Sequence, residues 1–171
     1  EESSKRKAME LRRQLEARID PLRKQIEDTR FFFYIANVDI REKLEAVRTS
    51  LEDVAEIMKA PENAGFPVGW RTLGVGYYFI GDRQLAEDYL KRAHELVPND
   101  PVAHQYLGKI YLDRAFQYKN GDLGSEPEER EARSVFWAGK ARTFLQKDSA
   151  GRSTGKTLQG SVALAYLSWL R

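Results

Sequence analysis

The chain has 171 residues, enough for one or two domains, and 42% of them are hydrophobic, enough to bury a core. Its net charge of +2 lacks the strong basic excess that is the usual footprint of nucleic-acid binding. The sequence has no cysteine, which excludes disulfides and thiolate metal sites, and two histidines are too few for a histidine-rich site. We therefore expect no metal, no cofactor and no nucleic-acid partner.

Membrane insertion and secretion find no support in the sequence. The longest apolar run, residues 31–36, is far shorter than the roughly 20 residues of a membrane helix. No secretory signal pattern is present. The lack of cysteine favours a reducing, cytoplasmic compartment. A membrane-anchored or exported parent protein stays open, because the chain starts at Glu1 without a methionine.

Residues 1–60 are predicted to form an N-terminal helical segment. Asp20 and Pro21 suggest a helix boundary, because aspartate caps a helix and proline suits its first turn. A second break is expected at residues 37–39, where Asp39 and Glu42 would form a capping box. The charged stretch 1–19 is predicted to be an exposed helix or a stalk. The aromatic run 31–34 is predicted to be core, with a subunit contact as the alternative.

The second half of this segment has the apolar spacing of a helix seam. Its apolar residues recur in alternating steps of four and three: Ile40, Leu44, Val47, Leu51, Val54 and Met58. The spacing predicts an amphipathic helix that packs on the rest of the chain, or alternatively a dimeric coiled coil. Pro61, Gly65 and Pro67 then mark a short linker.

Residues 69–98 are predicted to form a unit of two helices. Trp70, Leu73 and Tyr77 share one helix face, and Gly74 in that face would let a second helix approach closely. Residues 81–82 (Gly-Asp) predict a tight turn, and Pro98 ends the unit. The returning helix has small or apolar residues at matching steps: Ala86, Leu90 and Ala93.

These residues at this spacing resemble the tetratricopeptide repeat (TPR) family, whose period is 34 residues. A second copy starts at Pro101, with His104, Leu107, Gly108 and Tyr111 in the matching positions. Its first helix is expected to run on to about Tyr118 and a loop to cover residues 120–124. Ser125 and Glu128 are expected to cap a helix in which Ala132, Phe136 and Gly139 repeat the second-helix spacing. This alignment implies an insertion of about twelve residues.

The resemblance implies an all-α fold, an α-solenoid of TPR hairpins preceded by amphipathic N-terminal helices. The expected domains are residues 1–60 and a TPR domain over 66–171, with repeats at 67–100, 101–147 and a partial one at 157–171. It also implies a non-enzymatic scaffold that binds a peptide or partner helix in a concave groove. The groove positions are Val68, Arg71, Val75, Tyr78, Phe79, Val102, Gln105, Lys109, Leu112 and Asp113.

The groove composition favours an apolar ligand with one acidic contact. Arg71 and Lys109 supply cations among aromatic and aliphatic residues. Chaperone-binding TPRs hold a terminal carboxylate with lysine and asparagine. Val75 and Tyr106 stand at asparagine positions of that clamp, which argues against it here. The alternative function is self-assembly through the N-terminal helices, which makes a homo-oligomer.

Residues 150–157 satisfy a relaxed P-loop pattern, so nucleotide binding is a remote alternative. A P-loop needs a preceding strand, whereas residues 138–147 are predicted to be helical. Arg152 and Lys156 are the predicted anion contacts. They belong to a basic stretch over 130–156, which would either bind an acidic partner or complement a helix dipole. His94 and His104 are predicted to be packing residues. No nucleophile–base constellation can be assembled.

Overall fold

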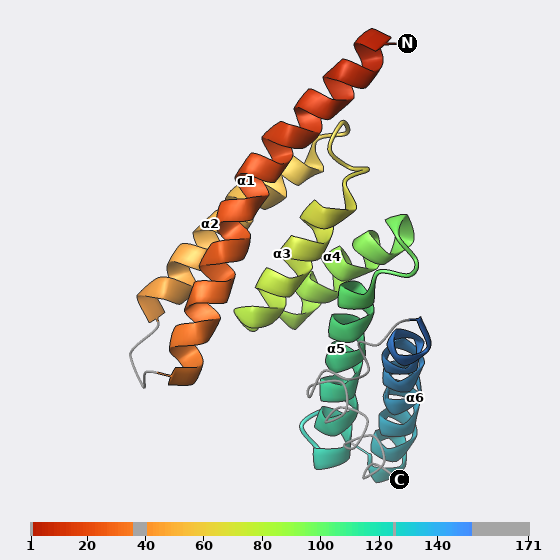
Figure 1. Ribbon diagram of the computed structural model, residues 1–171. Helices are drawn as coiled ribbons and strands as arrows, with labels where there is room; N and C mark the ends of the chain where they lie inside the picture. The colour runs from red at the N-terminus through yellow and green to blue at the C-terminus, as the bar shows by residue number, and fades with distance from the viewer. Residues whose placement is uncertain (1, 36–40, 125, 152–171) are drawn as a thin grey trace. The chain divides into compact units, whose positions relative to one another are not determined.

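The computed structural model describes residues 2–35, 41–124 and 126–151, and throughout these ranges the regular structure is helical. The prediction of an all-α fold is confirmed (Figure 1). Six helices are assigned in these ranges: α1 (Glu2–Ile35), α2 (Arg41–Lys59), α3 (Pro67–Phe79), α4 (Arg83–Leu96), α5 (Pro101–Asn120) and α6 (Pro127–Gly151).

The helices fall into two compact units, residues 1–97 and 98–171. The first unit holds α1 to α4, and the second holds α5 and α6. The boundary expected between residues 60 and 66 therefore lies inside the first unit, because α3 packs against both N-terminal helices.

Helix α1 continues through the predicted boundary at Asp20 and Pro21, so that prediction is wrong. Proline costs about 3 kcal/mol inside a helix because it removes a backbone hydrogen bond. The cost is offset by an apolar face that crosses Pro21 without interruption. Its buried residues, spaced by four, three and four, are Leu15, Ile19, Leu22 and Ile26.

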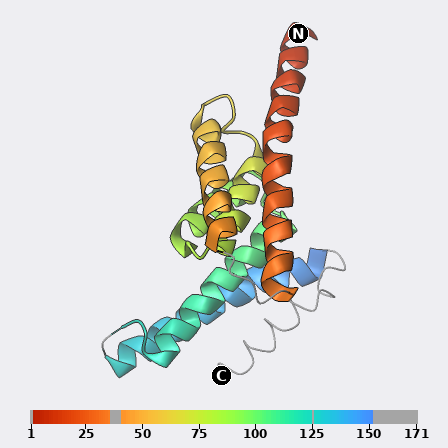
Figure 2. The ribbon, with the colours of Figure 1, turned by 90° about the vertical axis from the view of Figure 1, so that its left-hand side faces the viewer.

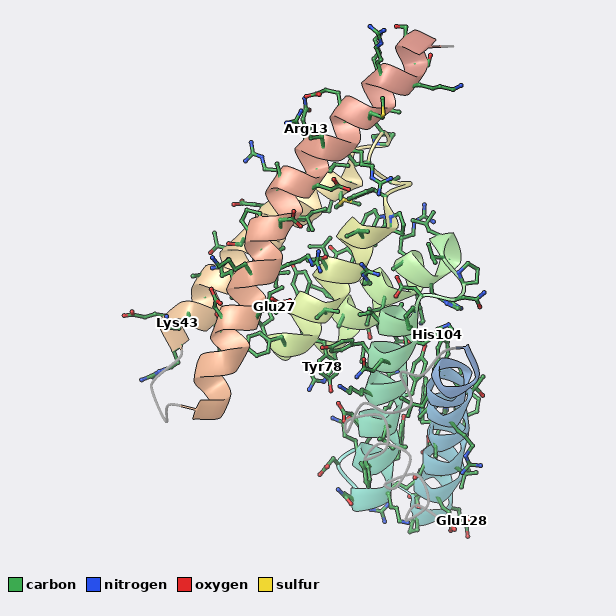
Figure 3. All side chains as sticks on the ribbon, in the orientation of Figure 1. Arg13, Glu27, Lys43, Tyr78, His104 and Glu128 are labelled. Atoms are coloured by element: carbon green, nitrogen blue, oxygen red, sulfur yellow. The ribbon has the colours of Figure 1, made fainter. Side chains whose placement is uncertain are left out.

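The N-terminal end of α1 extends beyond its neighbours in the first unit (Figure 2). Residues 3–10 are exposed, and the Met9 side chain retains 66% of its accessible surface. The predicted exposed helix is thus confirmed for these residues, whereas Leu15 and Ile19 are buried. Figure 3 labels Arg13 in this exposed part of the helix.

Helix α2 packs its predicted seam against α3. Val47, Leu51, Val54 and Met58 are buried, and Leu44 is half-buried. A side chain at Gly76 of α3 would overlap Leu51, and one at Gly69 would overlap Met58. Glycine at these two positions therefore permits the close contact between α2 and α3. The seam is therefore buried within the chain. Ile40, the predicted break at 37–39 and its Asp39 cap lie outside the described residues, as do the side chains of the aromatic run 31–34.

The first hairpin, α3 with α4, has the predicted internal packing. Trp70 and Tyr77 both stack on Tyr89 of α4, with ring centroids 5.7 Å and 5.5 Å apart. Gly74 faces Leu90, where a methyl group on the glycine would lie 2.5 Å from Leu90 Cγ. Helix α4 starts at the predicted turn, and its N-cap Asp82 accepts a hydrogen bond from the backbone N–H of Leu85.

The second hairpin, α5 with α6, repeats this packing in a different alignment from the predicted one. Gly108 faces Leu145 and the backbone of Ala141, so these two residues take the places of Leu90 and Ala86. The prediction that Ala132, Phe136 and Gly139 fill the second-helix positions is wrong. All three are exposed, and a side chain on Gly139 would meet nothing within 4 Å.

The corrected alignment changes the length of the insertion. Residue 86 corresponds to residue 141, a separation of 55 residues, whereas Gly74 and Gly108 are 34 residues apart. The second hairpin therefore has 21 additional residues between these positions, where the predicted alignment had about twelve. Helix α5 has seven residues more than α3 (20 against 13), and α6 has eleven more than α4 (25 against 14). The loop 121–126 is three residues longer than the loop 80–82. The predicted helix extension beyond Ala115 is confirmed.

Candidate partner-binding face

Helix α3 has three faces, of which two are packed. Successive residues turn by roughly 100°, so each face collects residues three and four apart. Gly69, Thr72 and Gly76 form the buried face on which α1 and α2 pack. Trp70, Gly74 and Tyr77 face α4, as described above. The third face holds the five positions that the sequence predicted for this helix, all half-buried: Val68, Arg71, Val75, Tyr78 and Phe79.

The end of this face has a cation that the sequence analysis did not include. The guanidinium of Arg83, the first residue of α4, lies 3.9 Å from the centre of the Tyr78 ring. It also donates a hydrogen bond to the backbone oxygen of Tyr78. Arg83 fixes the Tyr78 ring at the C-terminal end of α3, where Figure 3 labels this tyrosine. The sequence shows that Arg83 directly follows the predicted cap Asp82, but not that its side chain reaches back to Tyr78.

The face of α3 therefore combines apolar and cationic groups on one side of a helix. Val68, Val75 and Phe79 supply apolar surface, and Arg71 supplies a guanidinium one turn from Val75. Such a surface can bury apolar side chains and donate hydrogen bonds to a carboxylate. The residues of α3 are fixed in position by the packing of the other two faces.

The predicted positions on α5 also share one side of their helix. Val102, Gln105, Lys109 and Asp113 are half-buried, and Leu112 is buried, with 6% of its surface exposed. The ammonium of Lys109 lies 4.9 Å from the centre of the Tyr106 ring. This face belongs to the second unit, and α3 belongs to the first, so each face is described by itself.

Helix α5 is held in place at its start by an aspartate cap and along its length by rings. Asp100 is buried, and its Oδ1 accepts hydrogen bonds from the backbone N–H groups of Val102 and Ala103 at 2.9 and 3.0 Å. Tyr111 stacks on Trp137 of α6, with centroids 5.5 Å apart. These contacts set the rotation of α5 relative to α6.

The two histidines, which were predicted to be packing residues, lie on separate helices. His104 is buried, and its ring meets that of Phe144 edge-on at 5.6 Å. His94 lies in the last turn of α4. Within the described ranges, no group of three or more histidine, cysteine, aspartate or glutamate residues is arranged to hold a metal ion.

The basic residues of α6 are spread around the helix. Arg130 lies against Gly121 and Gly124 of the preceding loop, and Arg133 lies 3.7 Å from Glu129. The Lys140 ammonium lies 5.0 Å from the centre of the Trp137 ring. Arg152 and Lys156, the predicted anion contacts, lie outside the described residues, as do the cap at Ser125 and the partial repeat at 157–171.

The P-loop pattern begins inside α6. Ala150 and Gly151 are the last two residues of this helix, and the rest of the pattern lies outside the described residues. The segment before it is helical, as predicted, so the strand that a P-loop needs does not precede it.

Comparison of the chain with protein-family models, curated proteins and solved structures finds no match. Among the described residues, no helix has both the length and the apolar character needed to cross a membrane.

Proposed function

We propose that this chain is a TPR-like scaffold that holds an extended, partly apolar segment of another protein against the third face of α3. The supporting observation is that α3 has two fully packed faces and a third, half-buried face of mixed apolar and cationic composition. Five half-buried residues lie on that third face, although every residue of the other two is buried. Two helices of the first unit pack on one side of α3, and α4 packs on another.

The chemistry of the face indicates the kind of segment that it would hold. Val68, Val75 and Phe79 would bury apolar side chains of the ligand, each worth about 1.5–3 kcal/mol when fully buried. Arg71 belongs to this face, and the Arg83 guanidinium lies 3.9 Å from the centre of the Tyr78 ring; both cations favour an acidic group in the ligand. We therefore expect a ligand with apolar residues at alternate positions and one aspartate or glutamate.

The TPR-like arrangement is supported by the repetition of the hairpin. Helices α3 and α5 both have proline as their first residue, and residues 67 and 101 are one TPR period of 34 apart. Each hairpin has a glycine against a leucine of its returning helix, Gly74 with Leu90 and Gly108 with Leu145.

The test is selection of ligands from a random displayed-peptide library on the intact protein, followed by titration calorimetry with the enriched peptides. Arg71→Glu combined with Tyr78→Ala should reduce affinity at least about tenfold, because it reverses one charge and removes one ring. Lys24→Glu, an exposed charge reversal on α1, is the matched control. Enriched peptides that bind the double variant as tightly as the original protein would show that α3 is not the binding surface.

A further inference from the structure

Helix α6 has a second face with apolar character, on the side opposite to α5. Its inner face contains Ser134, Ala141 and Leu145, which are all buried. At roughly 100° per residue, a second set of residues falls about half a turn away from these. That outer stripe, exposed throughout, consists of Ala132, Val135, Phe136, Gly139 and Thr143.

The outer stripe presents large side chains beside an open position. Val135 and Phe136 retain 64% and 50% of their accessible surface. One turn further, no atom lies within 4 Å of where a side chain on Gly139 would begin. The stripe thus exposes two apolar side chains next to a position that has no side chain. Exposed apolar clusters with charged residues around them are typical of protein–protein contacts.

The charged residues on one flank of the stripe have opposite signs near its two ends. Glu128, Glu129 and Glu131 lie in the first turns of α6, and Lys140 and Arg142 lie beyond the stripe's centre. Figure 3 labels Glu128 at the end of α6 that adjoins the loop from α5. Arg130 and Arg133 lie among these glutamates, but Arg130 lies against the preceding loop and Arg133 lies 3.7 Å from Glu129. The flank that has Glu131 near one end and Arg142 near the other is therefore charge-complementary to the same flank of a second, antiparallel copy.

We propose that α6 pairs in antiparallel orientation with α6 of a second copy of this chain. Val135 and Gly139 lie two residues on either side of Trp137, so a two-fold axis at that level places each valine against the glycine of the other copy. Glu131 lies six residues before Trp137, and Arg142 lies five residues after it. Both are on the same flank of the stripe. The two-fold axis then brings Glu131 of each copy opposite Arg142 of the other. Shape and charge are both self-complementary, which favours a second copy over an unrelated helix.

The orientation can be tested by disulfide cross-linking, because the sequence has no cysteine of its own. Two full-length variants, Val135→Cys and Gly139→Cys, are oxidised separately and as an equal mixture. Antiparallel pairing predicts that the mixture yields cross-linked pairs of one variant with the other, several-fold more than either variant alone. Parallel pairing predicts the reverse, since each residue would then meet its own copy, and that result would overturn the proposal.

The energetic contribution is tested by sedimentation of the full chain over a range of concentrations. Phe136→Glu should abolish the dimer because it places a charge in the stripe. Glu131→Arg and Arg142→Glu should each raise the dimer dissociation constant by about tenfold, since the symmetry repeats each change twice, and the combined variant should restore it. Circular dichroism checks that all variants stay folded, and Met9→Glu on α1 is the control for contact through the N-terminal helices. A monomer at every concentration, or a dimer lost with Met9→Glu and kept with Phe136→Glu, would exclude α6 as the interface.

Discussion

The substitution Gly74→Ala examines the close contact on which the first hairpin depends. A methyl group at this position would lie 2.5 Å from Leu90 Cγ, 2.8 Å from Leu90 Cδ2 and 3.1 Å from the backbone nitrogen of Leu90. The crowding involves the branch point and backbone of Leu90, so a simple rotation of its side chain does not relieve it. Helices α3 and α4 would have to move apart.

The net effect follows from two opposing terms. Extra carbon in a packed core costs about 1–3 kcal/mol. Alanine recovers about 0.5–1 kcal/mol relative to glycine within a helix. We expect Gly74→Ala to lower the free energy of unfolding by about 1–2 kcal/mol, which lowers the melting temperature of a unit of this size by roughly 4–8 °C per kcal/mol.

Urea unfolding followed by circular dichroism measures the change, and two other glycines in helices supply the comparison. Gly139→Ala meets nothing within 4 Å and should stabilise the protein by about 0.5–1 kcal/mol at concentrations where it is monomeric. Gly69→Ala would contact the flexible end of Met58, which can move aside, so its cost should be smaller than that of Gly74→Ala. If Gly74→Ala is as stabilising as Gly139→Ala, the two helices are not in the close contact described.

Three further predictions follow from the same structure. Leu145→Ala should cost about 2–5 kcal/mol of stability because this side chain is 5% exposed, whereas Phe136→Ala should change stability by less than about 0.5 kcal/mol at concentrations where the protein is monomeric. Urea unfolding of both variants tests the corrected alignment, and equal losses would contradict it. Asp100→Ala should cost about 1–2 kcal/mol by removing the cap of α5, with Asp100→Asn as a milder control; an unchanged midpoint for the alanine variant would show that the cap contributes nothing. Burial raises the pKa values of Tyr77 and Tyr89 above 10.0, so the unfolded chain loses these protons first and stability should fall as pH rises above about 10. Thermal melts of the original protein and of the Tyr77→Phe, Tyr89→Phe double variant measure this, and equally steep losses in both would exclude the tyrosines as the cause.

The first hairpin could be predicted from the sequence because its signals are local and agree with one another. The Gly-Asp turn, the aspartate cap and the small residues at Gly74 and Ala86 all indicate the same pair of helices, and each is where it was expected. The Asp20–Pro21 signal failed because it was judged locally. The buried face that offsets the proline includes residues on both sides of it and depends on contacts with other helices.

The candidate site was only partly predictable for a related reason. The five positions on α3 follow from the helical period once the packed faces are identified. The contribution of Arg83 depends on where α4 starts relative to the end of α3, because its guanidinium reaches back over Tyr78. A contact between two elements across a turn is set by the geometry of that turn, which the spacing of apolar residues does not reveal.

The wrong alignment predicted for α6 shows how additional turns can preserve the packed face of a helix and at the same time create a second apolar face. Ala132 and Ala141 are nine residues apart, which is two and a half turns, so the two alanines lie on opposite sides of the helix. The spacing of Ala132 and Phe136 is therefore a real apolar periodicity, but it belongs to the outer stripe. The extensions of seven and eleven residues are close to two and three whole turns, so the inner faces of α5 and α6 stay in register over their whole length. Only one side of the added turns contributes to the inner face. Val135 and Phe136 lie on the other side of these turns. The added turns of the second hairpin thus coincide with the surface that we propose for dimerisation.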